Sequence, residues 1–394
     1  MDQLPFLDID APGFYDDPLP AIEEARRTSW VASSSRGHEI LTYEGCEAAF
    51  QNRDLHHGAQ RRLQQMGLEA GDVSGGGRNM ALTEGAEHTV LRRAVSRWFT
   101  PRQVGQLRER VRAHVEALIG PFTAAGGGEV MADVVRHLPG PVFCWMVGAP
   151  DEEGDRLYRL AANLQPAFSG DPEQVEAVMA ALAEMGTFIE ELMDAKRREP
   201  DDDLMSILLA AADAGELKPA DVFSVSMELL GASTENTANT AGLALDVLSA
   251  HPAEWQRLVA DRSLVPTAVE ECARYSPRVP CAHEWTPNGT QLLDLELPAD
   301  SDVFYWLIAG CFDPAVYPDP YHFDIGRVHA KPQLNFGAGS HFCPGAALAR
   351  MELQVLVDVL AERWETVEPA GDAQMRRGDT SVSVERLPLA VTPR

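Results

Sequence analysis

One cysteine in a glycine-rich segment is the residue best placed for chemistry in this 394-residue sequence. Cys343 lies within residues 336–345, which read FGAGSHFCPG, directly before a stretch of helical spacing at residues 346–364. Glycines let the backbone fold tightly around a sulfur, and a helix N-terminus favours a thiolate through its unpaired N–H groups and its dipole. Such a thiolate could be a nucleophile or an axial ligand to a large metal cofactor. The usual alternative is a buried structural cysteine. The ten consecutive constrained positions at residues 336–345 disfavour this alternative.

This segment resembles the signature of the cytochrome P450 family, Phe-Gly-x-Gly-x-His/Arg-x-Cys-x-Gly, at every fixed position. The resemblance implies haem b (iron protoporphyrin IX) as the cofactor and Cys343 as the proximal ligand of its iron. It also implies that Phe336 and Gly345 belong to the haem-binding loop and that His341 reaches a haem propionate. In this family the sulfur donates electron density that favours O–O cleavage.

Other segments resemble the family in the same order along the chain. Glu271 and Arg274 match its Glu-x-x-Arg, a pair that can share one helix face and that supports the haem-binding core in the family. Residues 319–327, 202–206 and 87–102 resemble its segments before the cysteine loop, before the central helix and around an early cationic helix. His88 and Arg92 stack two potential cations on one face there, an arrangement that needs an anion opposite. Haem propionates are the predicted anion, and a solvated basic face is the alternative.

The central helix departs from the family pattern at two positions. The aligned residues 232–237 read ASTENT, so that Ser233 replaces the usual glycine and Asn236 the usual threonine. An amide donates a hydrogen bond but does not readily relay a proton as a hydroxyl does. Either Glu235, Thr237 and water supply protons, or the substrate does, or Asn236 is a hydrogen-bonding scaffold with ordinary chemistry intact. A second departure places His283 where the family has a propionate-binding arginine; a histidine could serve protonated or as a neutral donor.

The surrounding sequence predicts a mainly α protein with small β-sheets, the cytochrome P450 fold, as a single domain over residues 1–394. Helical spacing covers residues 103–119, 172–197, 219–249 and 346–364. Alternation around a Pro-Asn-Gly-Thr turn at residues 287–290 predicts a β-hairpin within residues 277–303. Triple glycines at residues 75–77 and 126–128 are interpreted as loop tips, since the Gly-Lys-Ser/Thr of a phosphate-binding loop is missing.

The charge balance restricts the partners. With 33 Lys+Arg and 60 Asp+Glu the formal net charge is −27, which disfavours nucleic acid and anionic lipid. We expect no membrane span and no signal peptide, and therefore a cytoplasmic protein. The six cysteines lack CxxC pairing, so neither a zinc site nor a disulfide framework is expected.

The resemblance implies electrons from a ferredoxin and its reductase, because no flavin fingerprint or iron–sulfur spacing is present. An acidic ferredoxin needs a local basic patch on so negative a chain, and we predict one near Cys343. Its predicted members are Arg92, Arg93, Arg97, Arg102 and Arg350.

Three functions follow from the resemblance. The first is monooxygenation of a mid-sized specialised metabolite, as in soluble bacterial members of the family, with the substrate held by residues 55–81, 163–177, 230–237 and 279–285. The second is oxidative coupling of aromatic cyclic dipeptides or similar natural products, which the change at Asn236 leaves open. The third is a non-catalytic helper protein, which the intact Cys343 loop disfavours.

Overall fold

The computed structural model describes residues 4–65, 67, 69, 74–164 and 175–394. Most of the chain after residue 84 is helical: α5 (Gly85–Ser96), α6 (Pro101–Ala124), α7 (Val130–Asp133), α8 (Pro139–Val147), α9 (Gly154–Ala162), α11 (Val175–Arg198), α12 (Leu204–Asp213), α13 (Pro219–Ser233), α14 (Glu235–Ala250), α15 (Pro252–Ala260), α16 (Val265–Tyr275) and α18 (Ala346–Arg363). The remaining helices are α1 (Leu19–Arg26), α2 (Tyr43–Gln51), α3 (Gly58–Gln65) and α17 (Leu307–Cys311).

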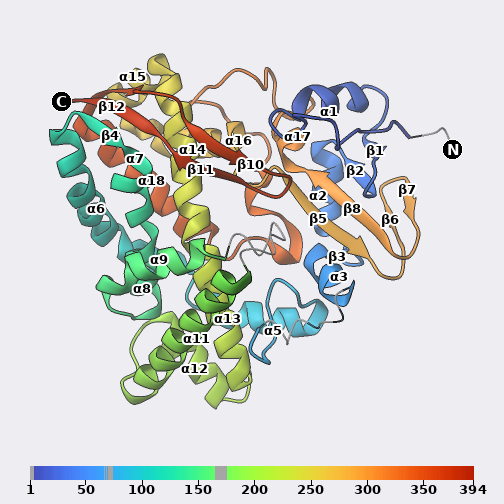
Figure 1. Cartoon of the computed structure of the whole chain (residues 1–394), viewed down its shortest axis with the longest axis horizontal. Helices are drawn as coiled ribbons and strands as arrows, with labels where there is room; N and C mark the ends of the chain where they lie inside the picture. Colours follow the sequence, from blue (N-terminus) through green and yellow to red (C-terminus); the bar gives the residue numbers. More distant parts are fainter. Residues whose placement is uncertain (1–3, 66, 68, 70–73, 165–174) are drawn as a thin grey trace.

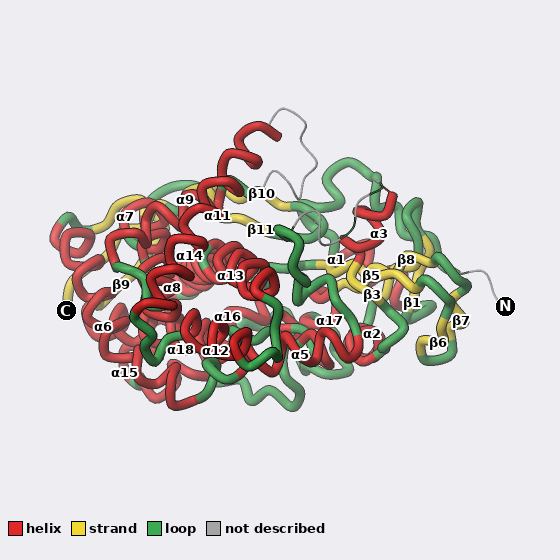
Figure 2. Tube along the Cα trace, turned by 90° about the horizontal axis from the view of Figure 1, so that it is seen from below, coloured by secondary structure: helices red, strands yellow, loops and turns green. Residues whose placement is uncertain are grey.

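Most of the helices lie on one side of the molecule, and the largest sheet lies on the other with α1, α2, α3 and α17 beside it (Figure 2). That sheet has the order β1-β2-β8-β5-β3, built from β1 (Val31–Ser33), β2 (His38–Ile40), β3 (His56–His57), β5 (Cys281–Thr286) and β8 (Ser301–Trp306). A three-stranded sheet joins β4 (Gly127–Glu129), β12 (Pro388–Pro393) and β9 (Trp364–Pro369), while β6 (Thr290–Leu292) with β7 (Leu295–Leu297) and β10 (Gln374–Arg377) with β11 (Val382–Arg386) form hairpins. The fold class predicted from the sequence is confirmed.

Helix starts follow ordinary capping chemistry. The Thr100 side chain accepts a hydrogen bond from the N–H of Gln103 at the start of α6, and Pro101 occupies the first turn, where it loses no hydrogen bond. Asp203 caps α12 in the same way by accepting from Ser206. The helical spacing in the sequence located α6, α11 and α18 to within a few residues.

The core of the molecule surrounds the paired helices α13 and α14, which together cross the fold (Figure 1). Twelve of the sixteen residues of α14 are buried, and α14 packs against α16, α18 and β9. A helix buried on nearly all sides owes its stability to tertiary packing rather than to propensity. The elements that flank Cys343 and Glu271 are therefore held by one continuous core.

Three sequence predictions need correction. The continuous helix predicted over residues 219–249 is broken at Thr234, which separates α13 from α14. The hairpin predicted within residues 277–303 is nested: β5 pairs with β8, and the smaller β6–β7 hairpin extends from their connection. The triple glycine at 126–128 is also not a loop tip, because Gly127 and Gly128 lie in β4 opposite β12.

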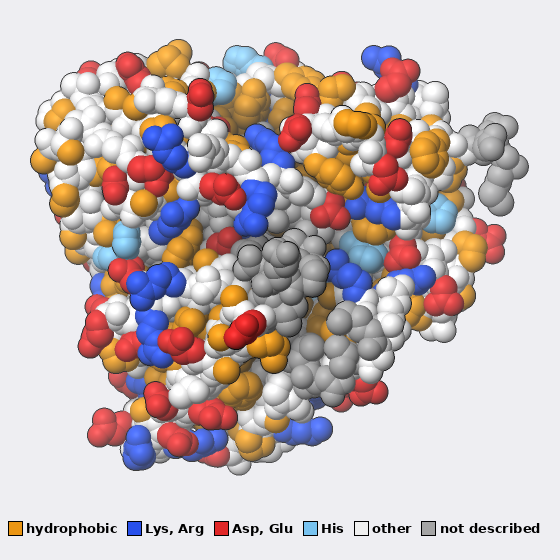
Figure 3. All heavy atoms as spheres, in the orientation of Figure 1, with side chains coloured by type: hydrophobic (Ala, Val, Ile, Leu, Met, Phe, Trp, Pro, Cys, Tyr) orange, Lys and Arg blue, Asp and Glu red, His pale blue; other side chains and the backbone are white. Residues whose placement is uncertain are grey.

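Lys and Arg side chains gather on the face shown in Figure 3, around the region where α9, β10 and β11 meet. This grouping stands out because the chain carries a formal net charge of −27. Among the described residues, no helix combines the length and the apolar character needed to cross a membrane.

Candidate active site

The cysteine loop is held by backbone contacts that its glycines permit. The N–H of Cys343 donates to the carbonyl of Phe336 at 2.8 Å, closing the loop on itself. Gly339 has φ +66°, and a Cβ there would overlap the carbonyl oxygen of Phe50, so only glycine is accommodated. The Arg350 guanidinium lies 4.3 Å from the Phe336 ring centroid and pairs with Glu270 at 2.5 Å. Phe336 and Cys343 are thereby fixed on the same wall of a cavity.

The sulfur of Cys343 lies between opposing influences. Burial raises the pKa of its thiol, while hydrogen bonds from the N–H groups of Gly345 and Ala346 and the charges of Arg92 and Arg350 lower it. The expected help from the N-terminus of α18 is therefore present, but it does not outweigh burial in the free protein. A Cβ at Gly345 would meet the sulfur at 3.9 Å, an ordinary contact distance, so the sulfur by itself does not exclude a side chain at this position.

His88 and His341, which the sequence assigned to haem propionates, lie side by side. Their rings stack with centroids 4.1 Å apart, and His341 Nε2 lies 2.9 Å from Glu84 Oε2. Burial, together with His341 and Arg92, lowers the pKa of His88 to about 4, so His88 is a neutral donor near pH 7 rather than the cation suggested by the sequence. Its Nε2 is buried without a hydrogen-bond partner. Arg92, one turn further along α5, donates to the carbonyl of Phe342 at 2.6 Å.

His283 lies on β5 with partners of its own. Its Nε2 is 2.9 Å from Asp302 Oδ1 across the β5–β8 pair, and its ring stacks on Phe304 with centroids 4.2 Å apart. Burial lowers its pKa although Asp302 raises it. The prediction that His283 binds a propionate stays a prediction, and it would have to share this histidine with Asp302.

The break between α13 and α14 forms the opposite wall of the cavity. Asn236 Nδ2 donates to the carbonyl of Ala232 at 3.1 Å and Thr237 Oγ1 to that of Ser233 at 2.9 Å. Side-chain bonds of this kind to the carbonyl four residues back bend a helix. These bonds flank the interruption of the helix at Thr234, directly after Ser233, which stands where the family usually has glycine. Ser233 Oγ is buried without a partner.

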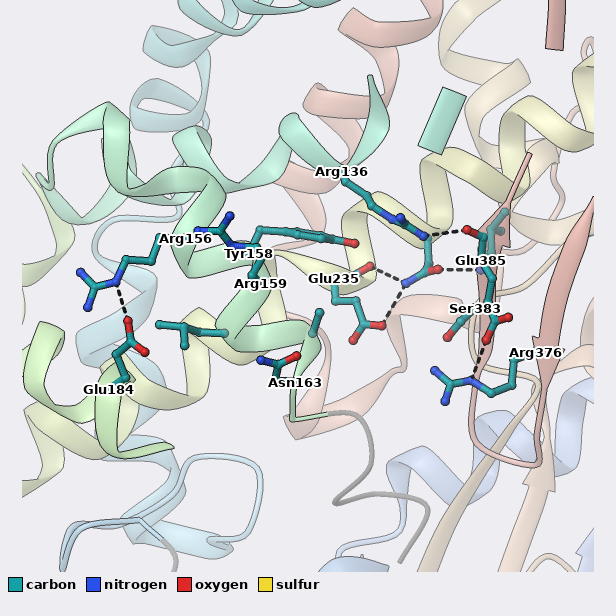
Figure 4. Close-up of a pocket in the computed structure, with 14 residues that line it drawn as sticks. Arg136, Arg156, Tyr158, Arg159, Asn163, Glu184, Glu235, Arg376, Ser383 and Glu385 are labelled. Atoms are coloured by element: carbon teal, nitrogen blue, oxygen red, sulfur yellow. Dashed lines mark hydrogen bonds and ion pairs between the residues drawn. The ribbon is translucent and has the colours of Figure 1, made fainter. Parts of the chain in front are cut away.

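Glu235 points away from Asn236, into a second pocket of about 570 Å³ between α9, α14 and β11 (Figure 4). Asn239 donates to the Glu235 side chain at 3.4 Å and to its carbonyl at 3.0 Å. Burial raises the pKa of Glu235 to about 7, against the lowering effect of Arg278 and Arg376. The structure thus divides three residues that the sequence grouped: Asn236 and Thr237 line the cavity of Cys343, and Glu235 lines its own pocket.

The residues around the cavity fit a haem with a thiolate ligand. A cavity of about 230 Å³ has walls from the cysteine loop, from the helix break and from the chain after α16, among them Phe336, Cys343, Asn236, Thr237 and Arg278. The unpartnered Nε2 of His88 and the adjacent Arg92 offer N–H donors to carboxylates. No group of three or more His, Cys, Asp or Glu suited to a metal ion occurs in the part of the chain that the structure describes.

Three residues of this region carried no recognisable sequence signal. Glu84 partners His341 through a contact 257 residues apart. Burial raises the pKa of Glu284, on β5, to about 8. Arg278 lines the cavity with a nearly buried guanidinium. The segment 163–177, predicted to contact substrate, lies largely outside the described residues.

Fold and site together define a thiolate-ligated haem enzyme built around a central helix. The family model for cytochrome P450 matches residues 157–391. The chain is 31% identical over 403 residues to luteothin monooxygenase from Streptomyces thioluteus, covering 98% of this chain and 96% of the relative. The chain belongs to the cytochrome P450 family, whose members bind a haem iron.

Solved structures agree with this membership. The crystal structure of CalO2 superposes with a TM-score of 0.91 over 98% of both chains at 24% identity, which shows the fold. CxnD, described as a cytochrome P450 enzyme for C–S bond formation in chuangxinmycin biosynthesis, superposes with a TM-score of 0.86 over the whole of both chains at 25% identity.

Proposed function

We propose that this cytochrome P450 binds haem b through Cys343 and inserts oxygen into a mid-sized specialised metabolite. The observation that carries the proposal is the position of Cys343, on one wall of a cavity whose opposite wall is the opened helix at Ser233–Thr237. The relative named luteothin monooxygenase supports the same reaction class. When bound, the haem would supply reductive activation of dioxygen and transfer of an oxygen atom.

The chain's own residues have separate tasks in this proposal. Cys343 holds the iron from one side. His88, Arg92 and His341 donate hydrogen bonds to the propionates. Asn236 and Thr237 line the cavity of Cys343. Each uses a side-chain donor on a backbone carbonyl, so water in the cavity would carry the protons.

The electrons that reduce the haem come from a separate protein in this proposal. We propose a ferredoxin and its reductase as the source, in the cytoplasm. Two members of the predicted basic patch are engaged elsewhere: Arg97 pairs with Glu216 at 2.6 Å and Arg350 with Glu270. Arg93 and Arg102 are exposed and, like Arg92, form no ion pair among the described residues.

The proposal is tested first by the absorption spectrum of the reduced carbon-monoxide complex. Thiolate ligation gives the family's diagnostic Soret position. We expect the purified protein to show it and Cys343→Ser to lose it while retaining the far-UV spectrum of a folded helical protein. A wild-type protein that takes up no haem, or a serine variant with an unchanged Soret position, would overturn the assignment and would favour the helper-protein alternative.

Oxidative coupling is the second candidate, favoured by Asn236. Its amide N–H is used on Ala232 and it has no hydroxyl, so proton delivery is less direct than in the family pattern. Aromatic cyclic dipeptides are the proposed substrates in that case. Product mass separates the two reactions, because monooxygenation adds one oxygen atom whereas coupling removes two hydrogens and joins two molecules.

A further inference from the structure

Arg278 is a buried cation for which the described residues supply no ion-pair partner. It follows the end of α16 by three residues, and its carbonyl accepts a hydrogen bond from the N–H of Val382 at 2.9 Å, which fixes the backbone against β11. The residue is 6% exposed. Its Nε and Nη1 are fully buried with no hydrogen-bond partner, and no ion pair with it occurs among the described residues. Such a guanidinium is costly to bury unless an anion completes it.

The surroundings of Arg278 do not supply that anion. Burial lowers the pKa of Arg278, and Glu235 raises it only through space. Glu235 Oε2 is itself buried without a partner, so the two groups lie near each other without bonding. Two further guanidiniums, Arg136 and Arg376, also act on Glu235. Its raised pKa, about 7, means that Glu235 is partly neutral at physiological pH and compensates Arg278 incompletely.

The neighbouring guanidiniums are already engaged. Arg376 lies 3.6 Å from Glu385, and Arg136 donates to the Glu385 carbonyl at 2.7 Å (Figure 4). Arg278 differs from both in lining the cavity that also contains Cys343 and Asn236. It is thus a fixed donor group at the place where a substrate would contact the opened helix.

We propose that Arg278 recognises a carboxylate on the substrate, and that this enzyme therefore acts on an anionic small molecule or on one carrying a free carboxyl group. The inference rests on the proposed oxygenase function and narrows its substrate class. A guanidinium presents planar paired donors that match a carboxylate. Once bound there, the anion also restricts how the rest of the molecule reaches the helix break.

A haem propionate is the other carboxylate that could meet Arg278. The donors suited to propionates lie elsewhere: His88 and His341 stack beside Glu84, and Arg92 lies at Phe342. None of these is among the charges that act on Arg278, which are Glu235, Arg376 and Tyr158. The geometry therefore favours the substrate as the source.

The test uses the haem-loaded protein and imidazoles that ligate the iron. Each probe carries an alkyl tether of three to six carbons from the ring nitrogen, ending in a carboxylate or in its methyl ester. The Soret shift on nitrogen ligation gives the dissociation constant without any turnover. We expect one tether length at which wild type binds the carboxylate at least tenfold more tightly than the ester. Arg278→Gln should reduce that preference to within twofold, and Arg278→Lys should retain part of it.

Arg377→Gln is the matched control, because it removes the same charge from an exposed position on β10 and should leave the preference unchanged. Absence of any carboxylate preference in wild type, at every tether, would overturn the proposal without needing a variant. The proposal would also be overturned if Arg278→Gln lost haem, measured as the Soret-to-280 nm ratio, but kept the preference for the carboxylate probe. The haem propionates would then be the partner of Arg278. A missing thiolate signature would instead refute the proposed function.

Discussion

The pKa values of individual side chains in this enzyme are shifted mainly by the depth of their burial. Glu235 shows this most clearly, since it is 6% exposed and burial raises its pKa to about 7 despite three nearby guanidiniums. Asn236, its neighbour in sequence, is open to the other cavity. Adjacent residues on a helix point about 100° apart, which separates an acidic group from the groove that its neighbour lines.

Glu235 should make stability depend on pH near neutrality. Because its folded pKa is raised, its contribution to stability is complete below its ordinary pKa of about 4.5 and is lost as pH rises through about 7. Glu235→Gln should remove that loss, by up to about 3 kcal/mol between pH 5 and pH 8. Urea midpoints of the haem-loaded proteins at both pH values measure the effect. Parallel pH profiles for wild type and variant would contradict it.

Elements are joined around the site by a buried ion network. Glu271 and Arg274, on α16, are 0% exposed and bonded at 2.7 and 2.8 Å. Arg327 adds a bond to Glu271 at 3.0 Å, and Arg274 donates to the carbonyls of Cys311 and Pro320 at 2.9 Å each. One helix is thereby tied to two segments that lead into the cysteine loop.

Breaking this network should destabilise the whole fold. Removing one partner of a buried pair costs about 3–5 kcal/mol, and we expect this loss in Glu271→Gln at pH 7. Burial raises the pKa of Glu271, but hydrogen bonds from Arg274 and His329 outweigh burial and lower this pKa to about 2. Its contribution is therefore present above about pH 4.5 and lost as pH falls toward 2. Acid unfolding followed by circular dichroism should become shallower in the variant; an unchanged acid transition would refute this.

At the scale of the molecule, charge decides how a redox partner approaches. The net charge of −27 repels an acidic ferredoxin, and two of the five arginines predicted for the basic patch, Arg97 and Arg350, are neutralised by their own ion pairs. Arg93 and Arg102 keep their charge exposed on α5 and at the start of α6. That residues 1–394 act as one domain stays a prediction at this scale.

Arg93 and Arg102 should control the rate of electron delivery. The double variant Arg93→Gln/Arg102→Gln should slow reduction by an acidic ferredoxin about tenfold at low salt, because charge steering governs association. The difference should shrink at 0.5 M salt, where screening removes it. Stopped-flow reduction measures both conditions, with Arg386→Gln on β11 as the control for lost charge. Equal rates for the double variant and the control at low salt would dismiss the patch.

What the sequence alone determined is local. The cysteine loop was predictable because its glycine positions and Cys343 lie within ten residues, and the Glu271–Arg274 pair because three residues span one helical turn. The helices over residues 103–119 and 346–364 followed from apolar residues at helical spacing, to within a few residues of α6 and α18. In each case the interacting groups are neighbours in the chain, so their spacing carries the information.

The tertiary structure decided what depends on distant partners. Which elements pack together determines three features of the site. These are the helix break at Thr234, the hydrogen bond between His283 and Asp302, and the unpartnered donors of Arg278. Burial then set the protonation of His88 and Glu235, in directions that residue type alone does not indicate. Desolvation is a property of the assembled core, and no short stretch of sequence contains it.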